Sequence, residues 1–474
     1  MTRIVYKSNG GAIGDGIRIT RVSGGGQRLE VLVDTVAERW SEVALVADTP
    51  APAPDPDPVP VPDPVPVPDP DPVPVPPVPS SPVPSPPIGG TTVAQDAADL
   101  MAKIAALAGS TGPQTLGIKR GHFDALTIAG VRLGAQMTIV AEDRREAIFE
   151  RIIITGSQDV RLQGLGTCPR DLPALNPKVK NYGITAMPDT ARIEVADAYC
   201  RGHLDSANHA HWTQAEWNAR ALGGVFLQGP DSLISGCYAE GVNFGFNLTG
   251  DGSAIRGAYV FGASGDAFRL AADGLAATDL LGTDLIYKRD GNHPDLCQGF
   301  KGIGGSNVRG VHGLTLRRLA GIEWTVRHDN PLRIASDANN VANKTPGIMQ
   351  GFGFHAVGHT DLDLEDIWIK TAVSNGIHIG GVTNLRGRRW TVLSGDYDVR
   401  ADRYPAPMQP GANYDTRFPK ISVNASGVVD VADTLAEAYS GDLTAMIVNR
   451  QDATDASYAL AEPAWVAAIR ALAV

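Results

Sequence analysis

Several common features are scarce or missing in this chain of 474 residues. Cysteine occurs four times, at Cys168, Cys200, Cys237 and Cys297, and no C-x-x-C pair is present. The spacing therefore predicts neither a zinc knuckle nor a thioredoxin-like redox motif, and we expect buried small apolar side chains instead. No run of 18 apolar residues occurs, and the opening MTRIVY lacks the apolar region of a secretory signal. The sequence thus predicts neither a membrane-spanning helix nor a Sec-type signal.

An excess of positive charge is also missing. Lys and Arg number 41 and Asp and Glu number 52, which gives a net charge of −11. Nucleic-acid-binding proteins normally present a basic face, so this balance disfavours a nucleic-acid partner. Aromatic residues make up only 6%, whereas 53 residues are Gly and 43% are hydrophobic. That composition predicts a Gly-rich globular chain with a large core.

Proline is concentrated in one segment, which divides the chain. Of the 34 prolines, 20 lie between Pro50 and Pro87, mostly alternating with Val, Asp or Ala. Alternate prolines fix φ and remove backbone donors, so residues 49–90 are predicted to form a polyproline II linker, in which the stretch from Pro50 to Pro87 spans about 120 Å if extended. The segment lacks the basic flank of a P-x-x-P docking ligand, which favours a spacer. Residues 1–48 before it are predicted to be a small β-rich anchor.

The body after the linker has the pattern of a solenoid. Residues 91–112 predict an amphipathic capping helix. From residue 113 to about 400, short alternating strands recur every 20–28 residues, with Phe226, Phe246 and Phe268 as aligned markers. The leucine-rich repeat ladder is missing, so the fold class predicted is all-β, a right-handed parallel β-helix. Residues 401–474 form a C-terminal region with a strand pair and a final helix.

Two segments carry a family resemblance. Residues 117–128 and 152–162 resemble the first coils of polysaccharide-processing members of the pectate-lyase-like right-handed β-helix superfamily. The layout of anchor, spacer, capping helix and β-helix also resembles bacteriophage tailspikes and tail fibres. This resemblance implies a virion component that acts at the host cell surface, attached to other virion structural proteins through residues 1–48. It also implies a homotrimer and a host surface glycan as the ligand.

A first candidate glycan-binding segment lies where strand alternation stops. Aromatic rings beside imidazoles and carboxylates suit a sugar surface, so we expect an outward loop with exposed rings. Its residues are His203, Asp205, His209, His211, Trp212 and Trp217. The alternative is a solvated loop with helical character from Thr213 to Ala221. The histidine spacings of 6 and 2 are not recurrent in metal sites, so no metal is predicted.

A second candidate segment carries the predicted catalytic residues Asp290, His293 and Asp295. Arg289, Gln298 and, from the next long connection, His328 are predicted to bind the glycan around them. Two carboxylates suit glycoside hydrolysis, whereas His293 could abstract a sugar proton beside Arg289 in lyase chemistry. An ordinary Asp/Asn/Gly turn is the alternative to both. No cofactor is predicted, and Asp361–Asp366 more simply forms a solvated strand face than a Ca²⁺ site.

Two functions follow from this organisation. The first is a virion-associated receptor-binding spike or fibre that binds a host surface polysaccharide, with or without cleaving it. The second is a free polysaccharide lyase or glycoside hydrolase of the same fold. A soluble enzyme gains nothing from a long rod, so the linker favours the first, while the sequence leaves open whether the protein is an enzyme.

Overall fold

The computed structural model describes most of the chain after the linker. The described residues are 92–170, 182–286, 294–301, 309–323, 325, 349–356, 358–371, 375–393, 420–441, 446–454, 457 and 460–473, with three strands near the N-terminus. The Pro-rich linker predicted at 49–90 lies outside them. The chain divides into two compact units, residues 1–75 and 76–474.

The N-terminal unit contains a small antiparallel sheet. Strand β2 (Gln27–Asp34) pairs with β1 (Ile17–Arg21) on one side and β3 (Arg39–Val43) on the other. These strands lie within residues 1–48, which were predicted to be β-rich. Attachment of this unit to a particle stays a prediction.

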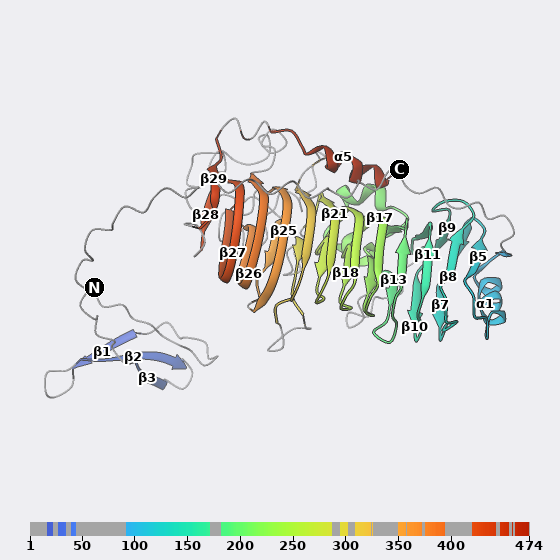
Figure 1. Cartoon of the computed structure of the whole chain (residues 1–474), viewed down its shortest axis with the longest axis horizontal. Helices are drawn as coiled ribbons and strands as arrows, with labels where there is room; N and C mark the ends of the chain where they lie inside the picture. The colour runs from blue at the N-terminus through green and yellow to red at the C-terminus, as the bar shows by residue number, and fades with distance from the viewer. Residues whose placement is uncertain are drawn as a thin grey trace, which may run out of the picture. The chain divides into compact units, whose positions relative to one another are not determined.

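The second unit is the expected all-β, right-handed parallel β-helix (Figure 1). Each coil contributes strands to three parallel sheets, and each strand pairs with its equivalents in the coils before and after it. The crossover connection between two parallel strands of one sheet is right-handed in nearly all proteins. We name the sheets A, B and C in the order in which the chain passes through them from β7 (Leu126–Ala129) onward.

Sheet A consists of single short strands and the beginnings of two long ones. Its members are β7 (Leu126–Ala129), β10 (Ile152–Thr155), β13 (Tyr182–Ala186), β16 (Gly223–Leu227), β18 (Phe246–Leu248), β20 (Phe268–Leu270), β22 (Asp295–Gln298), β24 (Gln350–Phe354), the starts of β26 (Asn375–Leu393) and β27 (Lys420–Ala436), and β28 (Ala438–Ser440).

Sheets B and C share the longer strands, which bend between the two sheets. Sheet B contains β4 (Thr92–Ala94), β5 (Gln114–Ile118), β8 (Met137–Ala141), β11 (Val160–Gln163) and β14 (Glu194–Ala196). Sheet C contains β6 (Gly121–Phe123), β9 (Ala147–Phe149), β12 (Leu165–Thr167) and β15 (Tyr199–Arg201). Both continue through β17 (Leu233–Val242), β19 (Ala254–Ala263), β21 (Ala276–Thr283), β23 (Thr315–Ile322), β25 (His359–Lys370), β26, β27 and β29 (Val448–Asp452).

The core is a set of apolar columns inside the coils. In sheet A, Val225 pairs with Phe246, which pairs with Phe268, and all three side chains are buried. The two phenylalanine rings stack with centroids 6.1 Å apart. Burying a side chain of this size stabilises the fold by about 1.5–3 kcal/mol. The predicted alignment of Phe226 with Phe246 is therefore wrong by one residue, and because a one-residue slip reverses facing, Phe226 lies on the outer face.

The bend between sheets B and C uses a repeated left-handed backbone conformation. Successive coils place Gly236, Gly257, Asp279, Arg318 and Asp366 there, with φ between 58° and 65°. Gly and Asp tolerate this region, whereas Arg does not favour it. Arg318 is held by a bidentate ion pair with Asp279 on the preceding coil, at 2.5 and 2.8 Å.

Both ends of the solenoid differ in detail from the predicted boundaries. Helix α1 (Ala97–Ala106) begins at an N-cap formed by Asp96 and buries Leu100 and Ile104 against the core, as a capping helix should. The parallel ladder continues to β29, which ends at residue 452, beyond the predicted end at 400. Helix α5 (Ala464–Arg470) and η6 (Ala471–Ala473) lie across sheet C, where Val466 and Ile469 pack against Tyr238 and Tyr259 (Figure 1).

All four cysteines are buried and free, as predicted. Within the described ranges, no helix is long and apolar enough to cross a membrane.

Candidate functional site

The outer face of sheet A carries two neighbouring columns of polar and aromatic residues, which we call the sheet A strip. One column contains Tyr182, Phe244, Asp266, Asp295, Gln350 and Asn375, and the other contains Phe226, Asn247, Arg269, Gln298 and His378. Backbone hydrogen bonds from the N–H of Gly245 to Asp266 and from that of Ala267 to Asp295 keep the columns in register. The strip spans seven coils, which is about 29 Å at about 4.8 Å per coil.

The end of the strip nearest the N-terminus is aromatic. The ring of Tyr182 lies 5.1 Å from that of Phe226 and 6.5 Å from that of Phe244. Asn247 donates from Nδ2 to the Tyr182 hydroxyl at 3.2 Å, while its Oδ1 is buried and accepts no hydrogen bond from any described residue. Burial raises the pKa of Tyr182 to about 12, so its hydroxyl stays neutral.

Arg269 organises the centre of the strip. Its guanidinium pairs with Asp266 at 2.5 Å and donates to Gln298 Oε1 at 3.2 Å. It also lies over the rings of Phe244 and Phe300, 5.0 and 5.3 Å from their centroids. Ion pairing on its edge and aromatic rings near its faces fix the orientation of this cation.

Asp295 stands beside Asp266 on the next coil. Its carboxylate accepts a hydrogen bond from Gln298 Nε2 at 2.8 Å, and its backbone N–H lies 3.4 Å from Asp266 Oδ1. Burial, and then the Asp266 carboxylate, raise the pKa of Asp295 well above its ordinary value, although Arg269 opposes this. The strip therefore pairs a carboxylate held by an arginine with a carboxyl group that favours its protonated form. Such a pair can supply a base and an acid.

The structure brings together two of the residues predicted in the second candidate segment, Asp295 and Gln298. The predicted residues Arg289, Asp290 and His293 lie outside the described residues, as does His328. Sequence reasoning missed Asp266, Arg269, Asn247 and Tyr182. The register of the strands could have identified Asp266 and Arg269. The D-x-x-R pattern that contains them and the D-x-x-Q pattern of Asp295 and Gln298 occupy equivalent positions on two consecutive coils, around the paired residues Phe268 and Cys297.

The first candidate segment folds differently from the prediction. It forms η1 (Ser206–His211) and α2 (Gln214–Arg220), which begins with a capping box between Thr213 and Glu216. The alternative of helical character from Thr213 to Ala221 is therefore confirmed.

The expectation of exposed rings in that segment is wrong. Trp212 and Trp217 are 2% and 1% exposed, and their rings pack edge to face at 5.0 Å. His209 is buried against Phe261, with ring centroids 4.7 Å apart. An insertion this short must bury its apolar side chains on the solenoid, so they cannot serve as stacking platforms.

The remaining polar residues of the segment hold it together. Asp205 accepts a hydrogen bond from Trp212 Nε1 at 3.0 Å and pairs with Arg220 at 2.8 Å. The hydrogen bond from Asn208, then the one from Trp212 and the charge of Arg220, lower the pKa of Asp205. His203 is half-buried with its ring 6.3 Å from that of Trp212, whereas His211 is exposed.

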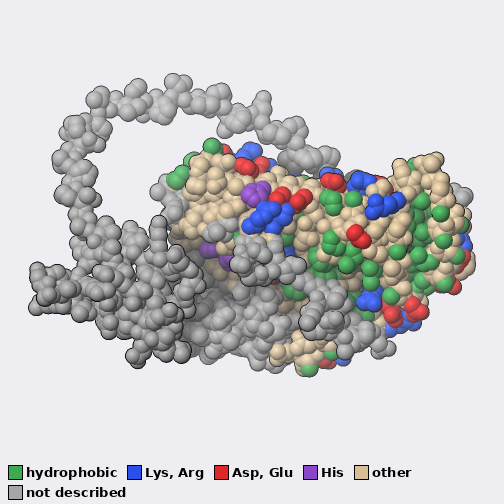
Figure 2. All heavy atoms as spheres, turned by 90° about the horizontal axis from the view of Figure 1, so that it is seen from below, with side chains coloured by type: hydrophobic (Ala, Val, Ile, Leu, Met, Phe, Trp, Pro, Cys, Tyr) green, Lys and Arg blue, Asp and Glu red, His purple; other side chains and the backbone are tan. Residues whose placement is uncertain are grey.

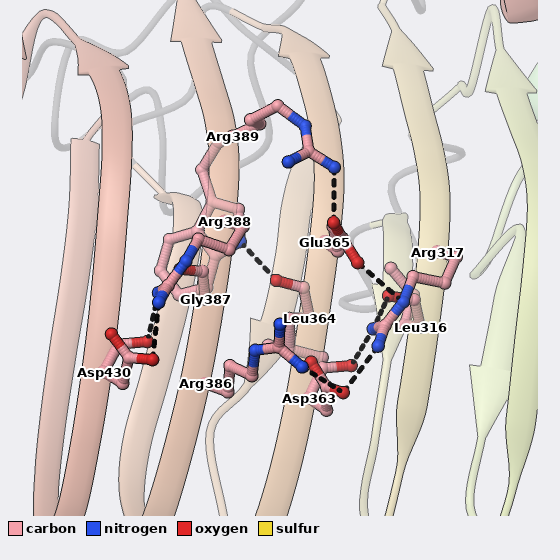
Figure 3. A network of polar contacts seen from close by, with 11 residues as sticks. Leu316, Arg317, Asp363, Leu364, Glu365, Arg386, Gly387, Arg388, Arg389 and Asp430 are labelled. Carbon is pink, nitrogen blue, oxygen red and sulfur yellow. Dashed lines mark hydrogen bonds and ion pairs between the residues drawn. The ribbon is translucent and has the colours of Figure 1, made fainter. Parts of the chain in front are cut away.

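The outer face of sheet B carries a ladder of ion pairs instead (Figure 3). Arg317 pairs with Asp363 at 2.5 Å and with Glu365 at 2.8 Å, and Arg388 pairs with Asp430 at 2.5 Å. Basic and acidic side chains also lie side by side on the face seen in Figure 2. In the described segments, no group of three His, Cys, Asp or Glu is placed to hold a metal ion.

No protein-family model matches this sequence, and no curated protein matches it. Similar solved structures include a mannuronic acid specific polysaccharide family 6 lyase from human gut microbiota, at 10% identity over 80% of this chain and 90% of that chain, with a TM-score of 0.36. Another is the mannuronan C-5 epimerase AlgE6 A-module of Azotobacter vinelandii, at 10% identity over 77% and 92%, with a TM-score of 0.34. The Dettilon tailspike protein is 12% identical over 73% and 64%, with a TM-score of 0.28. Similarity at this level says nothing about what this chain binds.

Proposed function

We propose that this chain binds an extended surface polysaccharide along the sheet A strip. The observation that carries the proposal is the continuous series of aromatic, amide, guanidinium and carboxyl groups on successive coils. A sugar chain presents apolar ring faces and hydroxyl groups in alternation. Tyr182, Phe226 and Phe244 supply surfaces for the former, and Asn247 and Gln298 supply donors and acceptors for the latter.

Asn247 is the residue whose geometry best fits a ligand hydroxyl. Its Nδ2 is already engaged by Tyr182, while its buried Oδ1 lacks a partner among the described residues. A buried polar atom without a partner destabilises a fold, so a ligand donor at this point gains a hydrogen bond at little cost.

The binding experiment compares variants of the strip with a variant of sheet B. Polysaccharides from host surfaces are titrated by calorimetry into the wild type, Asn247→Ala, Phe226→Ala and the control Arg386→Ala, whose side chain is exposed. We expect each strip variant to lose about tenfold in affinity or more, as expected for losing a hydrogen bond or an aromatic contact, and the control to bind as the wild type does. Equal affinity in all four proteins would contradict the proposal.

The biological setting proposed is a receptor-binding spike or fibre of a virion. Residues 1–48 attach the protein to other virion structural proteins, the linker at 49–90 sets the reach, and three copies assemble. The alternative is a free polysaccharide lyase or hydrolase. Detection of the chain in purified virions, by mass spectrometry, supports the first setting, and its absence from every particle overturns it.

A specific observation favours cleavage as a second function at the same strip. Asp295, with its raised pKa, lies beside Asp266, which Arg269 holds as an ion pair. Asp295 would donate a proton to the leaving oxygen while Asp266 acts as the base or nucleophile. Asp295→Asn should abolish the release of oligosaccharides and preserve binding. Turnover by Asp295→Asn at the wild-type rate would remove it from the chemistry.

A further inference from the structure

A polar cavity of about 410 Å³ lies on the outer face of sheet C, away from the sheet A strip. It is formed by β9, β12 and β15 together with the end of η6. Its lining contains the guanidinium groups of Arg144, Arg145 and Arg201 and one carboxylate, that of Glu146. The size lies in the range of small-ligand sites, and the lining has an excess of positive charge.

Two of the three arginines are held by the protein itself. Arg144 makes a bidentate pair with Asp197, at 2.7 and 2.9 Å. Arg145 is 8% exposed, pairs with the same carboxylate at 2.9 Å, and donates to the carbonyl of Leu472 at 2.6 Å. One carboxylate thus serves two guanidinium groups, and a net positive charge is left beside the cavity.

Arg201 differs from the other two arginines in its surroundings. Its guanidinium lies 5.3 Å from the centroid of the Tyr199 ring, and among the described residues no carboxylate pairs with it. Tyr199 is fixed in turn, because its ring stacks on that of Tyr238 at 5.1 Å and its hydroxyl donates to Glu240. Burial, and then the charge of Arg201, lower the pKa of His122 nearby.

The rest of the lining offers groups suited to a sugar. Tyr199 and Ile148 provide apolar surface.

We infer that this cavity binds a sugar ring that carries a carboxylate, such as a uronic acid. The carboxylate pairs with the planar donor fork of Arg201, and the apolar face of the sugar ring packs against Ile148. This inference goes beyond the proposed function and does not rest on it, because the sheet A strip contributes no residue to the cavity.

The test uses the full chain and single sugars that are too short to span the strip. Glucuronic acid, glucose and acetate are titrated by calorimetry into the wild type, Arg201→Ala, Arg201→Lys and the control Arg386→Ala. We expect glucuronic acid to bind the wild type and the control equally, and Arg201→Ala to weaken binding about tenfold or more. Arg201→Lys, which keeps the charge but loses the fork, should fall between them.

Three results would overturn the inference: no binding of glucuronic acid, unchanged affinity in Arg201→Ala, or acetate or glucose binding as tightly as glucuronic acid. Melting temperatures of all variants establish that they are folded. Asn247→Ala separates the two sites, because it should weaken polysaccharide binding and leave the binding of glucuronic acid unchanged.

Discussion

Replacement of Asp295 by Asn should make the stability of the solenoid less sensitive to pH. The Asp295 side chain is 0% exposed, and burial together with the Asp266 carboxylate raises its pKa in the folded protein. Asn has nearly the same shape and can accept the hydrogen bond from Gln298 Nε2. The substitution therefore removes the titration and changes little else.

The sign and size of the effect follow from proton linkage. Because the folded state holds the Asp295 proton more tightly than the unfolded state, the stabilisation is complete below about pH 3.9, the ordinary pKa of Asp, and is lost as pH rises through the raised pKa. Between those limits this single group lowers the free energy of unfolding by about 1.4 kcal/mol per pH unit. Asp295→Asn lacks this loss, so its stability relative to the wild type should increase from pH 4 to pH 7.

The assay is urea-induced unfolding, followed by circular dichroism, of both proteins at several pH values in that window. Asp124→Asn is the matched control, because the Asp124 side chain is 91% exposed. The difference between control and wild type should stay constant with pH. The reasoning fails if Asp295→Asn also keeps a constant difference, or if the wild type becomes relatively more stable at higher pH.

Three further substitutions test the core, the insertion and a buried histidine. Phe268→Ala empties a fully buried core position and should cost about 3–5 kcal/mol in unfolding free energy by urea titration. Trp212→Ala should likewise cost about 3–5 kcal/mol and expose the insertion to limited proteolysis, yet leave glycan affinity unchanged at concentrations where the protein is folded. Burial lowers the pKa of His359 to about 4, so the wild type should lose about 1.4 kcal/mol per unit as pH falls from 6.5 towards 4, and His359→Gln should not show this loss.

The repeat identified the fold class from the sequence because the core residues of a β-helix recur with a period of about one coil. Phe246 and Phe268 were aligned correctly, since both lie at the same position of consecutive coils. Phe226 was misassigned because a phenylalanine on the outer face looks the same in sequence as one in the core. Only the flanking Val225 and Leu227, both fully buried, settle the register.

The candidate site was predictable only in part, for a related reason. Asp295 and Gln298 were chosen because they lie in a dense polar segment, whereas Asp266 and Arg269 stand in an ordinary coil and attract no notice alone. The site that they form with Asp295 and Gln298 depends on the stacking of coils, which places residues 29 positions apart in the sequence beside each other. The prediction for Trp212 was wrong because its polar neighbours in the sequence indicated an exposed ring, whereas the ring packs in a buried cluster in the folded chain.

The three sheets share one core but differ in what covers their outer faces. Sheet C is covered along β17 to β21 by α5, through an apolar contact that includes Tyr238 and Tyr259 (Figure 1). Sheet B compensates its own charges with pairs such as Arg388–Asp430 (Figure 3). A long ligand would gain little binding free energy on sheet B or on the covered part of sheet C, because the ligand would have to displace contacts that the protein already makes. The strip on sheet A combines aromatic surface with the buried Asn247 Oδ1, which has no hydrogen-bond partner among the described residues, so an extended ligand gains most there.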